Sequence, residues 1–356
     1  MNKFSIILLL ILVGITYSQC DIGEVEIWEA CYPIETTTMF YNTDNTFGEF
    51  PIEICSLINL EILDLDVMWG NSNYITGEIP ECIGNLINLN YLNLGWNQLY
   101  GEIPESIGNL TNLTYFNTLY NQLSGEIPES IGNLSNLTYL NLGFNFFFGA
   151  IPESIGNLTE LTELYFSSNQ LSEPIPEFIG NLENLVMFSV FNNQIHGNIP
   201  ETIGNLIQLE SLNAAYNQLE GEIPESIGNL VNLERLWLNY NHLIGEVPST
   251  ICNLNMLNWS SYGFEGDESY LNDNQLCPPY PECISHNIGY QDISECFPIL
   301  LGDMNNDGIL NVIDIVLMIS MLLDGEYNVV ADVNEDGFVD ILDVVIMINI
   351  LVGGLP

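Results

Sequence analysis

A repeat with a strict period of 24 residues is the feature that most constrains how this chain can fold. The motif G-x-[IV]-P begins at seven glycines: Gly77, Gly101, Gly125, Gly149, Gly197, Gly221 and Gly245. Residue 173 keeps the same phase, although Glu173 replaces the glycine there in the variant EPIP. A fixed period of this length predicts a solenoid of stacked coils.

Leucines recur between these motifs in the pattern L-x-x-L-x-x-L-x-L-x-x-N-x-L. One coil cannot bury its own leucines, whereas stacked coils bury them in a continuous core. The L-x-L step alternates inward and outward, so each coil should add one short strand to a parallel sheet. We expect the Asn after each strand to bond backbone groups in a buried ladder. These residues are Asn97, Asn121, Asn145, Asn169, Asn193, Asn217 and Asn241.

These repeats resemble the leucine-rich repeat family, in the GxIP-bearing subtype best known from plant receptors and polygalacturonase inhibitors. The resemblance implies an α/β solenoid, a horseshoe with short parallel strands on its concave face. We therefore expect an N-terminal cap over residues 19–47, leucine-rich repeats over 48–277, and a C-terminal cap and linker over 278–301.

The first eighteen residues have the character of a secretory signal peptide, 1–18. Lys3 supplies the positive start, Ile6 to Val13 form the apolar run, and small residues, Thr16 and Ser18, precede the expected cut. The apolar run is too short to span a bilayer. We therefore predict a secreted protein, extracellular or associated with a cell surface, without membrane insertion. The alternative is a lipoprotein cut before Cys20.

Acidic residues dominate the charge, with 47 Asp and Glu against 2 Lys and Arg and a formal net charge of −45. Nucleic acids and anionic membranes are excluded as partners, because phosphates need Lys and Arg to displace their counterions. We interpret the charge as an aid to solubility in a salty exterior, where ions screen self-repulsion. The alternative interpretation is attraction of cations or of a basic partner.

Eight cysteines lie near the two ends of the predicted stack, and none lies between residues 83 and 251. In an exported chain this distribution predicts disulfides that close both ends. Cys55 and Cys82 fall in register on adjacent coils and are expected to pair. Cys277 and Cys283 are a second expected pair, and the remaining connectivity stays open.

Aromatic residues alternate with Asn on the outward side of the first three full coils. Exposed aromatic rows with amide donors suit a glycan or a protein surface, and the concave faces of solenoids commonly bind partners. The alternative is that aromatic residues simply favour strands and stack along a sheet. The predicted ligand-binding residues are Tyr91, Asn93, Trp96, Tyr115, Asn117, Tyr120, Tyr139, Asn141 and Phe144.

Two twelve-residue segments near the C-terminus, DMNNDGILNVID (303–314) and DVNEDGFVDILD (332–343), have the ligand spacing of calcium loops. Side-chain oxygens fall at places one, three, five, nine and twelve, a backbone carbonyl at seven and Gly at six, as in EF-hand coordination. We predict two Ca²⁺ ions. The predicted ligands of the first loop are Asp303, Asn305, Asp307, Asn311 and Asp314, with the Ile309 carbonyl. Those of the second loop are Asp332, Asn334, Asp336, Asp340 and Asp343, with the Phe338 carbonyl.

Each loop precedes an apolar helical segment, and CFPILLG (296–302) is too short and proline-bearing to supply an entering helix. This double loop-then-helix pattern resembles the type I dockerin family over residues 302–354. The resemblance implies docking to a cohesin-like or cell-surface protein, often in assemblies that degrade polysaccharides. The family's recognition positions fall on Val312, Ile313, Ile341 and Leu342, where the hydroxyl residues common in cellulosomal members are missing.

The segments 313–323 and 341–352 are apolar on nearly all sides, which predicts helices that are buried on several faces. A module of about fifty residues has too little interior to cover both. Some apolar surface should therefore remain for a partner, or alternatively for packing on the repeats.

Catalysis finds little support in the motifs of this chain. The three histidines, His196, His242 and His286, belong to no HExxH motif, and there is no glycine-rich phosphate loop. We therefore predict a secreted, non-catalytic recognition or adhesion protein. Its repeats would bind a protein or glycan, and its calcium-dependent module would dock it to a partner. The alternatives are a free inhibitor- or receptor-like protein with a calcium-stabilised cap, and a glycoside hydrolase.

Overall fold

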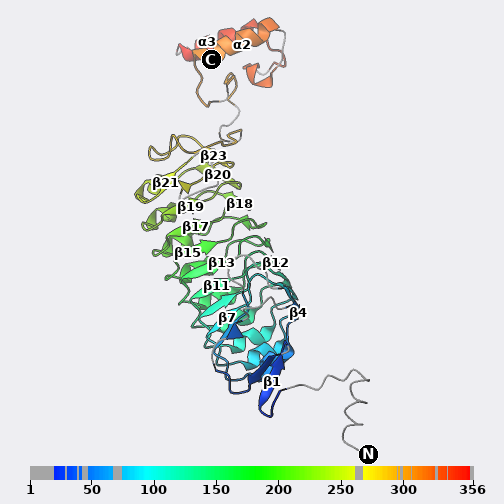
Figure 1. The fold of residues 1–356 in the computed structure, drawn as a ribbon. Helices are drawn as coiled ribbons and strands as arrows, with labels where there is room; N and C mark the ends of the chain where they lie inside the picture. The colour runs from blue at the N-terminus through cyan, green and yellow to red at the C-terminus, as the bar shows by residue number, and fades with distance from the viewer. Residues whose placement is uncertain are drawn as a thin grey trace, which may run out of the picture.

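The computed structural model describes residues 20–352 apart from 29, 38–39, 42–46, 67–73, 261–267, 295, 297–299, 306, 325–327 and 335. The predicted signal peptide lies outside the described residues. Figure 1 shows a long stack of coils that runs from β1 to β23, with two helices beyond its C-terminal end. Among the described residues, no helix has the length and apolar character needed to cross a membrane.

The concave side of the stack is a nine-stranded sheet in which every described pairing is parallel. Neighbouring full coils pair exactly one 24-residue repeat apart, for example Tyr91 with Tyr115 and Tyr115 with Tyr139. The predicted short strand per coil is therefore confirmed. The strands are β3 (Phe40–Tyr41), β5 (Ile62–Asp64), β7 (Tyr91–Asn93), β9 (Tyr115–Asn117), β11 (Tyr139–Asn141), β13 (Glu163–Tyr165), β15 (Met187–Ser189), β17 (Ser211–Asn213) and β19 (Arg235–Trp237).

Most coils contain a second short strand, which follows the main-sheet strand in sequence. These second strands pair in parallel in sheets of their own. One set of six contains β4 (Phe47–Glu49), β6 (Tyr74–Gly77), β8 (Gln98–Gly101), β10 (Gln122–Gly125), β12 (Phe146–Gly149) and β14 (Gln170–Leu171). A set of four contains β16 (His196–Gly197), β18 (Gln218–Gly221), β20 (His242–Glu246) and β23 (Gln275–Cys277). The smaller elements are an antiparallel hairpin of β1 (Glu24–Ile27) and β2 (Ala30–Pro33), and the parallel pair β21 (Asn258–Trp259) and β22 (Glu268–Ser269).

The repeated G-x-I-P motif joins each of these strands to a short 3-10 helix. Gly101 has a φ of +80°, a conformation that disfavours side chains, and Pro104 sets the φ of −68° from which the helix starts. Gly108 lies inside that helix, where an added Cβ would approach the Ser130 carbonyl oxygen to 2.5 Å. These glycines are therefore needed for the turn and for close stacking of the coils.

Each coil contains one short 3-10 helix on the side opposite the main sheet. These helices are η1 (Ile52–Ser56), η2 (Glu81–Asn85), η3 (Glu105–Asn109), η4 (Glu129–Asn133), η5 (Glu153–Asn157), η6 (Glu177–Asn181), η7 (Glu201–Asn205), η8 (Glu225–Asn229) and η9 (Ser249–Asn253). The repeated leucines and isoleucines of all coils join one continuous buried cluster. The core is thus shared between neighbours, as the repeat length requires.

The Asn ladder predicted from the sequence is confirmed. The Nδ2 of Asn145 donates to the carbonyl oxygens of Thr118 and Leu142, at 2.9 and 3.2 Å, and its Oδ1 accepts the Leu123 N–H at 3.0 Å. The same bonds recur from coil to coil. Asn274 and then Gln291 continue the ladder, so it extends beyond residue 277.

Four disulfides lie at the two ends of the stack. They join Cys20 to Cys31, Cys55 to Cys82, Cys252 to Cys283, and Cys277 to Cys296. The expected Cys55–Cys82 pair is confirmed, whereas the expected Cys277–Cys283 pair is wrong. That expectation rested on the short distance in sequence between the two cysteines. Cys277 ends β23, and Cys283 lies in the following turns, where it reaches back to η9 in the preceding coil.

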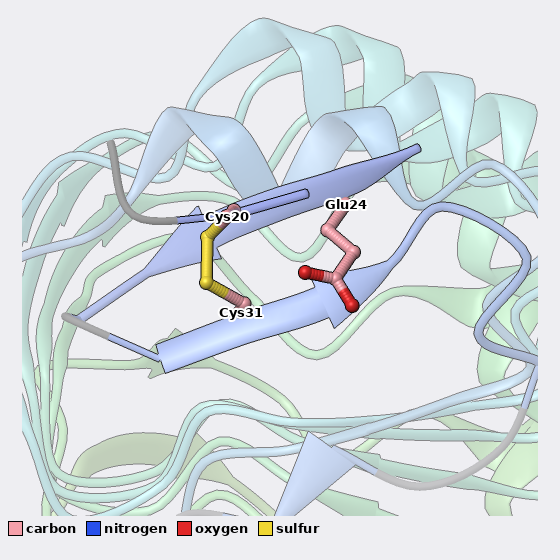
Figure 2. A group of neighbouring side chains, drawn as sticks. All are labelled: Cys20, Glu24 and Cys31. Carbon is pink, nitrogen blue, oxygen red and sulfur yellow. A yellow bond between two sulfur atoms is a disulfide. The ribbon is translucent and has the colours of Figure 1, made fainter. Parts of the chain in front are cut away.

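Figure 2 shows Cys20, Glu24 and Cys31, whose potential ligand atoms lie within 4.8 Å of one another. The two sulfurs form a bond of 1.99 Å, so neither is available as a metal-binding thiolate. The Glu24 carboxylate accepts the Asp21 N–H at 3.0 Å. This group is therefore a structural cap. The disulfide also uses the Cys20 thiol that the lipoprotein alternative would require.

The C-terminal module contains two loop-and-helix units, with α2 (Val312–Asp324), the 3-10 turn η10 (Val329–Ala331) and α3 (Ile341–Leu351). Its small core of Met318, Met321, Ala331, Val344 and Met347 is separate from the core of the stack within the described residues. The predicted double loop-then-helix order is confirmed.

Candidate functional site

The first row of predicted binding residues is a stack of tyrosine rings on the concave sheet. Tyr91, Tyr115 and Tyr139 lie in register, with ring centroids 4.3 Å apart and planes 9° apart at each step. All three are half-buried. Burial raises the pKa of Tyr91, and the nearby Asp64 raises it further. The row therefore offers neutral ring edges and hydroxyl groups rather than charge.

The second row is more exposed. Trp96, Tyr120 and Phe144 stack with centroid distances of 4.0 and 4.1 Å, and 45 % of the surface of Trp96 is exposed. Each adopts a left-handed backbone conformation with φ between 53° and 55°. That conformation is uncommon for bulky residues and recurs at this place in every full coil. It projects the rings beyond the ladder Asn and makes a continuous apolar strip.

The three Asn residues of the predicted patch are not exposed, which corrects the sequence-based expectation. Asn93, Asn117 and Asn141 are buried. The Oδ1 of Asn117 accepts the Leu119 N–H at 2.9 Å, and its Nδ2 donates to Asn93 Oδ1 at 2.9 Å. The amides therefore stabilise the strand ends through hydrogen bonds within and between coils. The described surface of these coils is aromatic, not aromatic interleaved with amide donors.

Sequence analysis missed three exposed aromatic residues on the neighbouring six-stranded sheet. Tyr100, Phe146 and Phe148 are exposed on β8 and β12. Their alternation with the buried Leu99 and Phe147 is the signal that could have found them. They extend the apolar character of the first coils to a second surface.

The two C-terminal loops have matching geometry. In the first, Asp303 Oδ1 accepts the Asp307 N–H at 3.2 Å, and Oδ2 accepts the Gly308 N–H at 2.7 Å. In the second, Asp332 accepts the N–H groups of Asp336 and Gly337 at 3.1 and 2.9 Å. Gly308 has a φ of +77° and Gly337 a φ of +87°. The sixth place thus needs glycine in both loops.

The twelfth-place carboxylates tie each loop to its helix. Asp314 accepts the Met304 N–H at 3.0 Å and the Asn311 N–H at 2.9 Å. Asp343 accepts the corresponding N–H groups of Val333 and Asp340 at 3.0 and 2.8 Å. Residues at the first and twelfth places are buried in both loops, so the carboxylates converge from opposite ends of each loop.

The chemistry of these loops fits a hard divalent cation. Each supplies side-chain oxygens from Asp and Asn and no sulfur or imidazole, which is the donor set that Ca²⁺ prefers. The module contains no Lys or Arg. The buried carboxylates accept backbone N–H groups, and a bound divalent cation would add the positive charge that the side chains of the module do not supply.

The helices of the module leave a wide apolar surface exposed. The four predicted docking residues, Val312, Ile313, Ile341 and Leu342, lie at or next to the first turns of α2 and α3 and are exposed. Val316, Leu323 and Val345 extend the surface along the helices. Large exposed apolar patches on soluble proteins often serve as interaction sites, so this surface is a candidate for one.

Comparisons with known proteins agree with both parts. Residues 55–198 match the model of a leucine-rich repeat region, and residues 208–230 and 232–254 match the leucine-rich repeat model. Residues 301–352 match the dockerin type I domain. The chain is therefore a leucine-rich repeat protein. More particularly, it carries a dockerin type I domain at its C-terminal side. No curated protein matches the chain.

The solved structures similar to the repeats include plant receptors. The leucine-rich repeat ectodomain of GASSHO1/SCHENGEN3 from Arabidopsis thaliana is 36 % identical with a TM-score of 0.62, over 67 % of this chain and 27 % of that one. The plant peptide hormone receptor RGFR1 is 31 % identical with a TM-score of 0.63, over 73 % and 44 %. The Arabidopsis receptor kinase HAESA is 32 % identical with a TM-score of 0.60, over 68 % and 39 %.

This chain spans less than half the length of each of these receptor structures. Both matched families are non-catalytic, and together they support a role in protein interaction. Dockerin type I domains typically bind calcium. The disulfides and the two families suggest an extracellular protein.

Proposed function

We propose that this protein is a secreted, non-catalytic recognition subunit. Its repeat stack binds an extracellular ligand, and its dockerin type I domain fixes it to a cohesin-like or cell-surface protein. The observation that carries the proposal is the separation of two surfaces. Aromatic rows lie on the stack, and an uncovered apolar face lies on a module with its own core.

Docking would use the first turns of the two helices. Val312 and Ile313 on α2 correspond to Ile341 and Leu342 on α3, so the module presents two similar apolar surfaces. Burying such side chains on a partner is favourable by about 25 cal/mol for each Å² of apolar surface removed from water. The apolar identity of these positions favours a hydrophobic partner surface over one that reads hydroxyl groups.

Calcium would control docking through folding. One ion in each loop would be held by the side-chain oxygens at places one, three, five, nine and twelve, with the carbonyl oxygen of Ile309 or Phe338. Bound Ca²⁺ supplies the positive charge that these carboxylates lack. The ion would therefore stabilise both helices and, through them, the apolar docking face.

A pull-down with the full chain tests the docking half of the proposal. The chain would be used as bait against the secreted and surface proteins of its source, in calcium and in excess chelator. We expect a cohesin-bearing partner in calcium only. The variant Ile341→Ser with Leu342→Ser should lose it, and Ile207→Ser, at an exposed site on the stack, should keep it. Capture that is equal with and without calcium would contradict the proposed docking.

Ligand recognition on the stack is proposed at the two aromatic rows of the first three full coils. Flat rings in rows bind sugar rings or apolar side chains with little loss of conformational freedom. Probing glycan and protein arrays with the full chain would identify the ligand class. Replacing Tyr91, Tyr115 and Tyr139 by Ala should then abolish binding while the chain still folds. Unchanged affinity would reject this surface.

A receptor-like protein that acts free in solution is the second candidate. It is favoured by the similarity of the repeats to receptor ectodomains, among them RGFR1 and HAESA, whose structures contain peptide hormones. In that case the stack would bind its ligand, and no cohesin-bearing partner would be recovered in calcium.

A further inference from the structure

A hollow lies far along the stack from the aromatic rows. A cavity of 340 Å³ opens near the C-terminal end of the main sheet. Its walls are the side chains of Phe191, Tyr216, Trp237 and Tyr270, from four successive coils. This volume falls at the lower end of the range typical of small-ligand pockets, about 300–1,000 Å³.

The hollow arises because small residues interrupt rows of large ones. Ala215 lies one repeat after Phe191 and one repeat before Asn239, and it lines the cavity. Asn213 pairs in register with Trp237, which in turn is bridged to Tyr270. Ala215 is flanked in its row by the longer side chains of Phe191 and Asn239, and Asn213 lies beside Trp237, so a hollow remains over Ala215 and Asn213.

Asn239 gives the cavity an unsatisfied acceptor. Its side chain is only 5 % exposed, and its Oδ1 has no hydrogen-bond partner among the described residues. By contrast, Asn213 Oδ1 accepts the Ala215 N–H at 3.2 Å. Most buried polar atoms are paired, and each exception requires an explanation. A ligand that brings an N–H donor into the cavity would satisfy this oxygen.

The hydrogen-bond donors of Trp237 and Tyr270, two residues that line the cavity, already have acceptors outside it. Trp237 Nε1 donates to the Glu268 carbonyl oxygen at 2.7 Å, and the Tyr270 hydroxyl donates to Glu268 Oε2 at 2.9 Å. Trp237 therefore offers the cavity only ring atoms. The Tyr216 ring packs edge-on to Phe191, with centroids 5.5 Å apart. The cavity thus combines aromatic rings with an acceptor, which suits a planar cation.

The overall charge of the chain also favours a cation, although Arg235 lies two residues before Trp237 on β19. The Glu268 carboxylate lies beside Tyr270, and the chain as a whole carries a formal charge of −45. A guanidinium group has N–H donors for Asn239 and stacks on aromatic rings. A quaternary ammonium would leave the Asn239 oxygen unpaired, because it has no N–H.

We propose that this cavity binds an arginine side chain of a basic protein partner, with the guanidinium against Trp237 and donating to Asn239 Oδ1. This site is separate from the aromatic rows at Tyr91–Tyr139 and does not depend on them. The strongly acidic surface would attract such a partner, and the cavity would then select arginine at one position.

The probe is the peptide acetyl-Gly-Gly-Arg-Gly-Gly-amide, titrated against the full chain in calcium and 150 mM salt, a condition that screens exposed charge. Ligand-observed NMR measures the weak affinity expected of one side chain. We expect the matched citrulline peptide, which has the same shape without the charge, to bind at least tenfold more weakly. Ala215→Leu, which fills the hollow, and Asn239→Leu, which removes the acceptor, should each weaken arginine binding at least tenfold.

Asn192→Leu is the matched control, because Asn192 is an exposed amide on the same face outside the cavity. It should leave the affinity unchanged. Thermal unfolding checks that each variant folds, and Asn239→Leu decides the question if Ala215→Leu does not fold. Equal binding of the citrulline peptide, or full binding by the folded Leu variants, would overturn the proposal. So would binding of cellotetraose with none of the arginine peptide, which would assign the cavity to a glycan.

Discussion

The repeat stack and the C-terminal module treat their apolar residues in opposite ways. In the stack, the repeated leucines and isoleucines are buried almost completely, and each coil is covered by its neighbours. In the module, Val312 at the start of α2 is 68 % exposed, and Ile341 at the start of α3 is 69 % exposed. The stack therefore buries the apolar residues of its repeat and exposes aromatic side chains, whereas the module exposes aliphatic side chains of both its helices.

Polar groups show the same contrast. The stack pairs the buried amides of its Asn ladder with backbone groups of its own coils. The module buries Asp303, Asp314, Asp332 and Asp343 in a segment without Lys or Arg. A self-contained stack and a module proposed to need a metal and a partner can be tested separately.

Loss of the calcium ligands should have the largest effect. Asp303→Ala together with Asp332→Ala removes the first carboxylate of each loop, and we expect the module to unfold completely at micromolar calcium. Titration calorimetry should show about two sites in the parent chain and none in the variant. Far-UV circular dichroism should report loss of the helical signal.

Asp324→Ala is the matched control, because Asp324 is an exposed carboxylate at the end of α2 outside both loops. It should keep both calcium sites and the helical signal. A folded double variant would show that the module does not need the metal.

Reduction of the disulfides should have the next largest effect, and only at the ends of the stack. Each disulfide typically contributes about 2–4 kcal/mol to the free energy of unfolding. Hydrogen exchange after reduction should therefore rise first near residues 31–60 and 252–296. A uniform rise along every coil would mean that the middle of the stack also depends on its ends.

Removing one rung of the amide ladder should have a smaller effect on the same stack. Asn145→Ala leaves the buried N–H of Leu123 unpaired, which costs about 1–3 kcal/mol in the free energy of unfolding. Asn136→Ala removes only an exposed bond to the Thr111 carbonyl and should cost about 0.5 kcal/mol or less. Denaturant unfolding of the two variants would measure the difference, and equal costs would reject a structural role for the ladder.

The docking residues should have the smallest effect on stability. Ile341→Ser with Leu342→Ser changes side chains that are already exposed, so the unfolding free energy of the module should change by about 0.5 kcal/mol or less. Thermal unfolding in saturating calcium measures this change. A large loss of stability would mean that the two side chains belong to the core of the module.

The repeat period made most of the stack predictable. The strands and the Asn ladder follow from residues that recur every 24 positions, and the Cys55–Cys82 pair follows from the placement of two cysteines in adjacent coils, 27 residues apart. The pairing of Cys252 with Cys283 could not be predicted in this way, because the last coil departs from the repeat and its path is set by packing. Gln291 takes the place of a ladder Asn for the same reason and carries no repeat signal.

The candidate surfaces were less predictable than the fold. Outward positions identified Tyr91 and Trp96, but the pattern could not show that Asn93 is buried. The cavity at Ala215 could not be predicted from the repeat pattern either, because that pattern describes one coil at a time. It depends on which side chains stand beside one another in four different coils, and a small residue becomes a hollow only between larger ones.

Hydrogen exchange of the full chain in calcium and in excess chelator tests the central claim most directly. The account predicts that chelation removes protection from residues 302–352 alone, while the coils over residues 74–260 keep theirs and the cohesin-bearing partner is released. Protection that persists in the module without calcium, or that is lost throughout the stack as well, would contradict a self-contained recognition stack with a calcium-dependent docking module.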